Sequence, residues 1–327
     1  NLLEETIVRQ WAGIVDHDFP TRVVMFDGAM QNGAAYESMN LAAIYDLPMV
    51  FIVENNLYGV STHVSEATRE SRLSARGQGL AVLSLEVDGM NVMAVRKAMD
   101  DAGHPALLMV DTISSLASIN YRHDEWGVDV TIGGSQKGLM LPPGLGFNAV
   151  GAKALAASDT AAMTRSYWDW GPMLTANKGG AFPYTPATNL LYGLDEALTM
   201  LGEEGLVNVF HRHARLAEAA RLAVAAWGLE TVAQNEGEMS NSLTAVMLPD
   251  GHNADDFRAT VLERFNMSLG NGLGRLAGKV FRIGHLGDFN ELMLAGTLSG
   301  VEMGLAAANI PHNRGGVQAA LDYLSPN

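Results

Sequence analysis

Two residues at the ends of expected strands are of types that could act together on one substrate. Asp111 ends the apolar run LLMVD, and Lys137 follows a second strand-like run within GGSQKGLMLPPG. Ligands of doubly wound sheets bind at the carboxyl ends of the strands, so this carboxylate and this amine are expected to face one crevice. A lysine amine forms an imine with an aldehyde, and a carboxylate keeps a pyridine nitrogen protonated. The pair therefore fits the needs of pyridoxal 5'-phosphate.

The elements that must position these residues alternate between strand-like and helix-like patterns. This alternation predicts an α/β fold with a doubly wound, mainly parallel sheet. We expect strands at 22–26, 49–53, 83–87, 106–111, 128–132 and 147–150, and helices at 34–45, 67–78 and 91–101. Two long helices at 189–200 and 204–227 should follow. A smaller α/β domain is then expected, with strands at 244–248 and 280–283 and helices at 254–264 and 290–308.

Composition narrows the classes of function. The formal net charge of −15 disfavours nucleic acid as a partner, because a polyanion would be repelled. The chain has no cysteine, which excludes disulfides and thiolate nucleophiles and favours a cytoplasmic location. Its apolar runs fall short of the roughly 20 residues that a membrane helix needs, so we expect no membrane association.

Three strings in order, VDTISSLAS, YRHDEWGVDV and GGSQKGLMLPPGL, resemble class V pyridoxal-phosphate aminotransferases. Each residue taken singly would also suit a turn or a solvated surface, so the complete strings carry the resemblance. It implies that Lys137 is the Schiff-base lysine, that Asp111 partners the pyridine nitrogen and that Gln136 contacts the cofactor phosphate. It also implies that Thr185, in FPYTPATNLLYG, reaches the phosphate in a neighbouring subunit. Arg282, in VFRIGHLG, would bind the substrate carboxylate as a two-pronged guanidinium grip.

The resemblance extends from about residue 95 to residue 327 and is greatest to serine–glyoxylate enzymes, with alanine–glyoxylate enzymes a step further away. It implies a fold-type I homodimer that transfers an amino group from serine or alanine to glyoxylate, with small amino acids and oxo acids as its partners. The family's Gly-rich phosphate loop does not precede these strings. Because helix N-terminal amides supply much of such an anion site, we expect weakened cofactor binding and impaired activity.

The preceding segment, about residues 20–95, resembles the alpha subunit of thiamine-dependent 2-oxo acid dehydrogenases of the pyruvate and acetoin type. The resemblance rests on FDGAMQNGAAYESMN followed by ENNLYGVST. It implies a thiamine diphosphate–magnesium site, with Asp27 and Asn56 as side-chain ligands and Tyr58 as a carbonyl ligand; oxygen ligands suit Mg²⁺. Phe26 stands where that motif has Gly, and a phenyl ring fills space that the diphosphate would need.

The two resemblances meet in the expected helix 91–101, which starts like the thiamine family and ends like the aminotransferase. We therefore expect a partial thiamine-fold segment at 1–95, a partial aminotransferase large domain at 96–225 and a small C-terminal domain at 226–327. Three hypotheses remain open: an aminotransferase, a fragment of a thiamine-dependent dehydrogenase alpha subunit, and a catalytically inactive fusion product.

Two further groups of residues invite functional interpretations that the sequence disfavours. His211 and His213 could suggest a metal site, but residues two apart on a helix point to different faces. Trp168 and Trp170 could line a pocket, yet packing in the core or at a dimer interface is the favoured interpretation.

Overall fold

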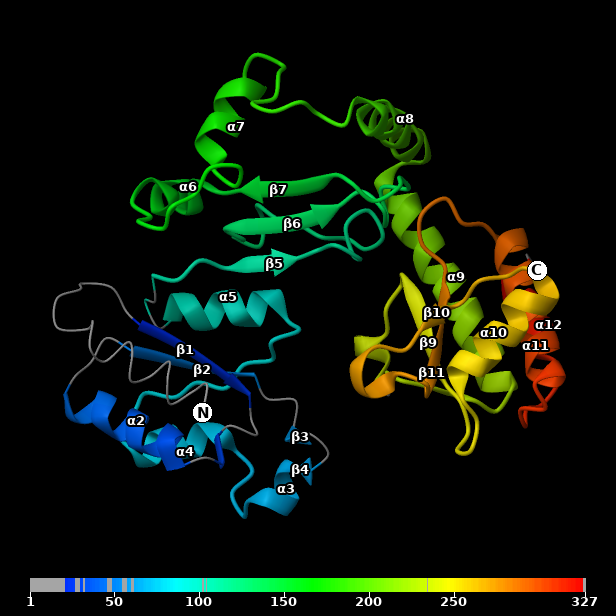
Figure 1. Ribbon diagram of the computed structural model, residues 1–327, viewed down its shortest axis with the longest axis horizontal. Coiled ribbons are helices and arrows are strands. Elements are labelled where there is room, and N and C mark those ends of the chain that lie inside the picture. Colours follow the sequence, from blue (N-terminus) through cyan, green and yellow to red (C-terminus); the bar gives the residue numbers. More distant parts are fainter. Residues whose placement is uncertain are drawn as a thin grey trace. The chain divides into compact units, whose positions relative to one another are not determined.

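A computed structural model (Figure 1) divides the chain into two compact units, Asn1–Gly103 and His104–Asn327. The structure describes residues 21–26, 30–31, 33–45, 49–54, 58–59, 62–101, 103, 105–233 and 235–325. In this described part, every helix is too short or too polar to cross a membrane. The division into three domains at residues 95 and 225 stays a prediction.

The first unit is built on two parallel strands. β1 (Thr21–Phe26) pairs with β2 (Met49–Glu54), and α2 (Gly33–Ile44) makes the crossover between them. Both strands and the helix lie where the sequence predicts them. Side chains from residues before, within and after α2 form a small core, consisting of Met30, Ala35, Met39, Val64 and Leu73.

The rest of the first unit departs from the predictions in two places. The expected helix 67–78 is instead two helices, α3 (Val64–Ala67) and α4 (Leu73–Gly79), which follow the short antiparallel strands β3 (Tyr58–Gly59) and β4 (Thr62–His63). The expected strand 83–87 is wrong, because this segment pairs with no strand in the described part of the chain. Its apolar positions are exposed, Leu83 at 83%, so the alternating pattern has no sheet face to cover.

α5 (Val92–Asp101) closes the first unit, close to its predicted bounds. None of its residues is buried. The helix carries two ion pairs, each between residues one helical turn apart: Arg96 with Asp100 and Lys97 with Asp101. The Lys97 pair is exposed on both sides and contributes about 0.3–0.5 kcal/mol, whereas the Arg96 side chain is only 15% exposed.

The second unit begins with a three-stranded sheet. Strand β5 (Met109–Asp111) runs parallel to β6 (Val130–Gly134), and β7 (Gly146–Val150) lies antiparallel on the other side of β6 (Figure 1). The direction of β7 follows from its connection. Residues 135–145 contain no helix, and a parallel return would require a crossover of a dozen or more residues.

Four helices follow this sheet. They are α6 (Ala152–Asp159), α7 (Trp170–Asn177), α8 (Thr188–Glu204) and α9 (Leu206–Ala226). The two long helices were predicted, whereas α6 and α7 were not. Gly205 separates α8 from α9 with a φ of +82°, a backbone conformation that glycine adopts at little cost.

The C-terminal part of the second unit is an antiparallel sheet covered by helices. Its strand order is β10 (Gly270–Asn271), β11 (Val280–Gly284), β9 (Leu243–Met247), β8 (Glu230–Thr231). The covering helices are α10 (Ala254–Phe265), α11 (Glu291–Ala307) and α12 (Gly316–Leu324), and short 3-10 turns lie at Glu236–Glu238 and Gly274–Leu276.

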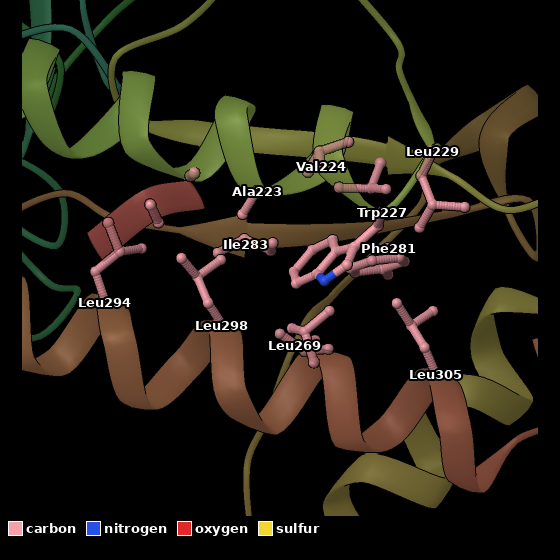
Figure 2. Close-up of a cluster of buried hydrophobic side chains, with 14 of the residues drawn as sticks. Ala223, Val224, Trp227, Leu229, Leu269, Phe281, Ile283, Leu294, Leu298 and Leu305 are labelled. Atoms are coloured by element: carbon pink, nitrogen blue, oxygen red, sulfur yellow. The ribbon is translucent and has the colours of Figure 1, made fainter. Parts of the chain in front are cut away.

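The largest hydrophobic core of the described residues lies between α9, α11 and this sheet (Figure 2). Leu294, Leu298 and Leu305 of α11 point toward the sheet residues Phe281 and Ile283, and all five are fully buried. The predicted strands 244–248 and 280–283 and helices 254–264 and 290–308 agree with β9, β11, α10 and α11 to within one or two residues.

Trp227 of this core forms a side-chain hydrogen bond. The indole is buried, and its Nε1 donates to Glu302 Oε2 at 2.7 Å. A Cβ at Gly316 would lie 2.2 Å from Nε1, so the start of α12 can approach the ring only because residue 316 has no side chain.

Candidate active site

Asp111 and the loop that carries Lys137 leave the same edge of the three-stranded sheet. Asp111 is the last residue of β5 and lies opposite Ile132 of the parallel strand β6. β6 ends at Gly134, and Lys137 follows three residues later. Because β5 and β6 are parallel, a carboxylate and an amine are both delivered to the carboxyl end of this sheet.

The carboxylate of Asp111 is oriented by the turn that follows it. Its Oδ1 accepts a hydrogen bond from the Ile113 N–H at 2.8 Å, and the side chain is otherwise exposed. The next residue, Thr112, is fully buried and donates from both its N–H and its hydroxyl to the Ile132 carbonyl. The β5 end is therefore fixed to β6 immediately beside the carboxylate.

The loop around the lysine is held by hydrogen bonds within the loop and by close packing against the preceding segment. Ser135 is buried, donates from Oγ to the Pro142 carbonyl and accepts from the Leu145 N–H. Gly138 packs so closely on the preceding segment that a Cβ there would lie 2.1 Å from the Leu116 carbonyl oxygen. Lys137 itself is half-buried. The backbone on both sides of the lysine is thus tightly constrained.

The remaining expected phosphate contacts lie at two different places. Gln136 is exposed beside Lys137, and a Cβ at Gly134 would lie 3.0 Å from its Oε1, so the amide folds back over the end of β6. Thr185 is exposed in the connection between α7 and α8. The structure therefore brings Asp111, Gln136 and Lys137 to one sheet edge, while Thr185 belongs to a separate exposed segment.

Arg282 lies on β11, opposite Gly270 and Ala245. Its Nε is buried and has no hydrogen-bond partner among the described residues. A Cβ at Gly270 would lie 3.2 Å from that Nε, so the guanidinium stem rests on the glycine. A buried donor without a partner is costly, and an anion would satisfy it.

The segment 284–290, which follows Arg282, contains a buried histidine that the sequence did not predict to be functional. His285 is buried, donates from Nδ1 to the Asn241 carbonyl at 3.2 Å and accepts from the Thr244 hydroxyl at 2.9 Å. Burial lowers the pKa of His285 to about 4, and the positive charge of Arg221 acts in the same direction. Its place in the string VFRIGHLG was the only signal for it in the sequence.

His213 of α9 forms a hydrogen bond with this segment. It is fully buried, while His211 is exposed, so the two histidines occupy different faces of the helix as predicted. Its Nδ1 donates to the Val209 carbonyl at 2.8 Å, and its Nε2 accepts from the Gly287 N–H at 3.0 Å. Burial lowers the pKa of His213, which keeps the imidazole neutral.

Two of the three expected magnesium ligands lie outside the described residues. Asp27 and Asn56 lie outside the described residues, and Tyr58 is described only as the first residue of β3. In the part of the chain that the structure describes, no group of three or more His, Asp or Glu side chains could hold a metal ion.

Two protein families match this chain. The family described as Dehydrogenase E1 component matches residues 19–106, and Aminotransferase class-V matches residues 88–274, which is more than half of the chain. A serine–glyoxylate aminotransferase from Methylorubrum extorquens is 51% identical over 243 residues, covering 72% of this chain and 60% of that enzyme. One from Arabidopsis thaliana is 50% identical over 236 residues, covering 72% and 59%.

The chain thus spans about three fifths of the length of these relatives. Among solved structures, pyridoxamine–pyruvate aminotransferase from Mesorhizobium loti matches with a TM-score of 0.70 at 23% identity, covering 98% of this chain and 81% of that one. The ureidoglycine–glyoxylate aminotransferase of Bacillus subtilis matches with a TM-score of 0.68 at 22% identity, covering 95% and 80%. The fold is accordingly that of fold-type I aminotransferases. With Asp111 at the end of β5, Lys137 in the loop after β6 and the match across residues 88–274, the chain belongs to the class V aminotransferase family.

Proposed function

We propose that the chain catalyses pyridoxal-phosphate-dependent transfer of an amino group to glyoxylate, with serine, or alanine, as the donor. The observation that supports this proposal most directly is the delivery of Asp111 and Lys137 to one edge of the sheet by two parallel strands. The identity of about 50% to serine–glyoxylate aminotransferases favours serine as the donor.

The residues at the sheet edge fit the cofactor by their chemistry. When bound, pyridoxal phosphate supplies an electron-withdrawing ring that stabilises negative charge at the substrate α-carbon. The Asp111 carboxylate would face the ring nitrogen, and the Gln136 amide would donate to the phosphate. The half-buried Lys137 would attach the cofactor through Nζ. Once displaced, the same Nζ would take the proton from the α-carbon and return it at the other reacting carbon.

Arg282 would hold the substrate carboxylate. Its buried Nε lacks a partner among the described residues, and a carboxylate would satisfy it. Serine, alanine and glyoxylate share this carboxylate and differ in the rest of the molecule. One arginine could therefore serve the donor and the acceptor in turn.

A second copy of the chain is the partner that we infer for an aromatic surface around α7 and α8. Tyr167 contacts Trp168 and Tyr184, with ring centroids 5.3 and 5.0 Å apart, and Trp168 is 81% exposed. Exposed apolar patches of this kind mark interfaces. Thr185 follows Tyr184 directly, so a homodimer formed here would bring Thr185 toward the partner's cofactor. Analytical ultracentrifugation tests this, and a monomer at micromolar concentration would refute it.

The match of residues 19–106 to the dehydrogenase E1 component supports a second candidate function. In that case the N-terminal unit would bind thiamine diphosphate with Mg²⁺ through Asp27, Asn56 and Tyr58. Titration calorimetry with thiamine diphosphate, with and without Mg²⁺, tests it on the chain and on Asp27→Ala. Binding that requires Mg²⁺ and is lost in the variant would favour this candidate.

Borohydride reduction in the presence of pyridoxal phosphate, followed by peptide mass spectrometry, tests the leading proposal. We expect one adduct per chain at Lys137, its loss in Lys137→Ala, and no loss in Lys178→Ala, which removes an exposed lysine. Serine–glyoxylate turnover is then assayed. Scattered labelling of surface lysines would contradict the proposal, and binding of neither cofactor would leave a catalytically inactive protein.

The absence of cysteine leads us to infer a cytoplasmic location.

A further inference from the structure

Both peptide groups of Gly287 are held by consecutive residues of α9. The Gly287 N–H donates to His213 Nε2 at 3.0 Å. Arg212 Nη1 donates to the Gly287 carbonyl at 2.7 Å and to the Phe289 carbonyl at 3.1 Å. The segment 284–290, which leads from β11 to α11, is therefore fixed by three hydrogen bonds from one turn of a helix.

Arg212 is itself held in place by a carboxylate. Glu204, the last residue of α8, accepts from Arg212 Nε at 2.7 Å and from Nη2 at 2.8 Å. These two bonds lower the pKa of Glu204, so the carboxylate stays ionised. The paired bonds use one side of the guanidinium and leave Nη1 directed at the two carbonyls. Geometry of this kind restricts the arginine to one orientation.

The other side of Gly287 faces the lysine loop. A Cβ at this position would lie 3.6 Å from the Lys137 carbonyl oxygen and 3.6 Å from Met140 Cγ. Its φ of +85° also favours glycine. Gly287 is thus in contact with the lysine loop, five residues after Arg282 on the same stretch of chain.

We propose that Arg212 and His213 are positioning residues that set the distance between Arg282 and Lys137. By fixing Gly287, they hold the strand end that carries the substrate-binding arginine against the loop that carries the catalytic lysine. This inference rests on the proposed function, because it assigns the two residues a role in presenting a substrate carboxylate. Neither residue would touch the substrate.

The bond to Gly287 exists only for a neutral imidazole. Nδ1 is the donor to the Val209 carbonyl, which leaves Nε2 with the lone pair that the Gly287 N–H needs. Burial disfavours protonation, and Arg212 opposes it further; Glu204 and the Val209 carbonyl act in the opposite direction. His285 is the ionisable group of the following segment that interacts with His213, and Asp288 of that segment interacts with Arg212.

Two variants distinguish the role of the acceptor at Nε2 from the role of the donor at Nδ1. His213→Gln places an amide oxygen near the position of Nε2 and keeps an acceptor for Gly287. His213→Asn keeps a donor near the position of Nδ1 and loses that acceptor. His211→Asn changes an exposed histidine on the same helix and is the control. Arg212→Lys is a second variant, because an ammonium can pair with Glu204 but cannot reach two carbonyls and the carboxylate as a fork.

We expect His213→Asn to raise KM for both serine and glyoxylate by about tenfold, the ratio that corresponds to one buried hydrogen bond. kcat, and the amount of borohydride adduct formed at Lys137, should each stay within about threefold of the wild-type values. His213→Gln should restore most of the KM. A purely structural role would lower the active fraction, and with it kcat, while leaving KM unchanged, and that result would overturn the proposal.

Amide hydrogen exchange of the peptide that contains residues 284–289 gives a readout that needs no cofactor. We expect faster exchange in His213→Asn and in Arg212→Lys, and near wild-type exchange in His213→Gln and His211→Asn. Unchanged exchange in His213→Asn would show that His213 does not fix segment 284–290, and would overturn the proposal. If exchange behaves as expected but the wild type forms no adduct at Lys137, the proposed function has failed, and the positioning role fails with it.

Discussion

His285 should make the second unit sensitive to acid. The side chain is fully buried, its Nδ1 donates to the Asn241 carbonyl, and its Nε2 accepts from the Thr244 hydroxyl. Protonation would put a hydrogen on Nε2, which would break the second bond and leave a charge in the protein interior. Burial, with Arg221 nearby, therefore lowers the pKa of His285 to about 4.

The direction and size of the effect follow from linkage. In the unfolded chain a histidine has a pKa of roughly 6.5, so the unfolded state takes up a proton before the folded state does. The contribution of His285 to stability is complete above that pKa and is lost as pH falls toward about 4. For these two values the free energy of unfolding should be about 2 kcal/mol lower at pH 5 than at pH 8.

The variant His285→Asn isolates this contribution. It keeps a donor for the Asn241 carbonyl and removes the titrating group, at a loss of about 1–2 kcal/mol at pH 8 because the Thr244 hydroxyl loses its acceptor. Urea unfolding at pH 8 and pH 5 is followed by far-UV circular dichroism and tryptophan fluorescence. The difference between the two pH values should be about 2 kcal/mol smaller in the variant than in the wild type.

His211→Asn, on the exposed face of α9, is the matched control and should retain the full wild-type dependence on pH. The reasoning would be refuted if His285→Asn lost as much stability on acidification as the wild type. In that case the acid sensitivity would arise elsewhere, and the imidazole would be accessible to protons in the folded state.

Two further substitutions test the packing of the lysine loop and of the core. Gly138→Ala should reduce the borohydride adduct at Lys137 several-fold, because the new Cβ would lie 2.1 Å from the Leu116 carbonyl; Gly146→Ala, where a Cβ meets nothing within 4 Å, should leave it unchanged, and equal labelling of both variants would contradict the steric argument. Leu298→Ala should lower the free energy of unfolding by about 3 kcal/mol. The exposed Leu292 on the same helix should lose less than about 0.5 kcal/mol on the same change, as urea unfolding can measure.

Much of the fold could be predicted because its elements have local signals. The strand β2 is a short apolar run between a proline and a polar segment, and α10 begins after Asn253, whose side chain accepts from the Asp255 N–H. Patterns of this kind are complete within a dozen residues. They depend little on the rest of the chain.

The elements that were predicted wrongly or missed depend on contacts with residues distant in the sequence. Leu83, Leu85 and Val87 alternate with polar residues as a strand would, but strand formation requires a neighbour, which a local pattern does not reveal. α12 was missed although it is amphipathic, with Gly316, Ala320 and Leu324 buried; it packs on α9 and α11, and its start approaches Trp227. The antiparallel direction of β7 is likewise set by the length of a loop and not by its own residues.

The same division applies to the candidate site. Asp111 and Lys137 could be placed at one sheet edge from sequence, because parallel strands share a carboxyl end. The contact between His213 and Gly287 joins residues 74 apart, and no periodicity predicts which helix face meets which glycine. In the string HRH, the sequence suggested only a metal interpretation, which it disfavoured.

α5 has a consequence for how such a chain can arise and be rebuilt. None of its residues is buried, and Arg96 with Asp100 and Lys97 with Asp101 form ion pairs within the helix. The matches to the two families overlap at residues 88–106, a stretch that includes this helix. A genetic crossover within the α5 coding region would exchange half-buried and exposed positions and no fully buried one, so we expect the accompanying loss of stability to be small. The same stretch is a suitable splice site for grafting other N-terminal segments onto the lysine-bearing unit.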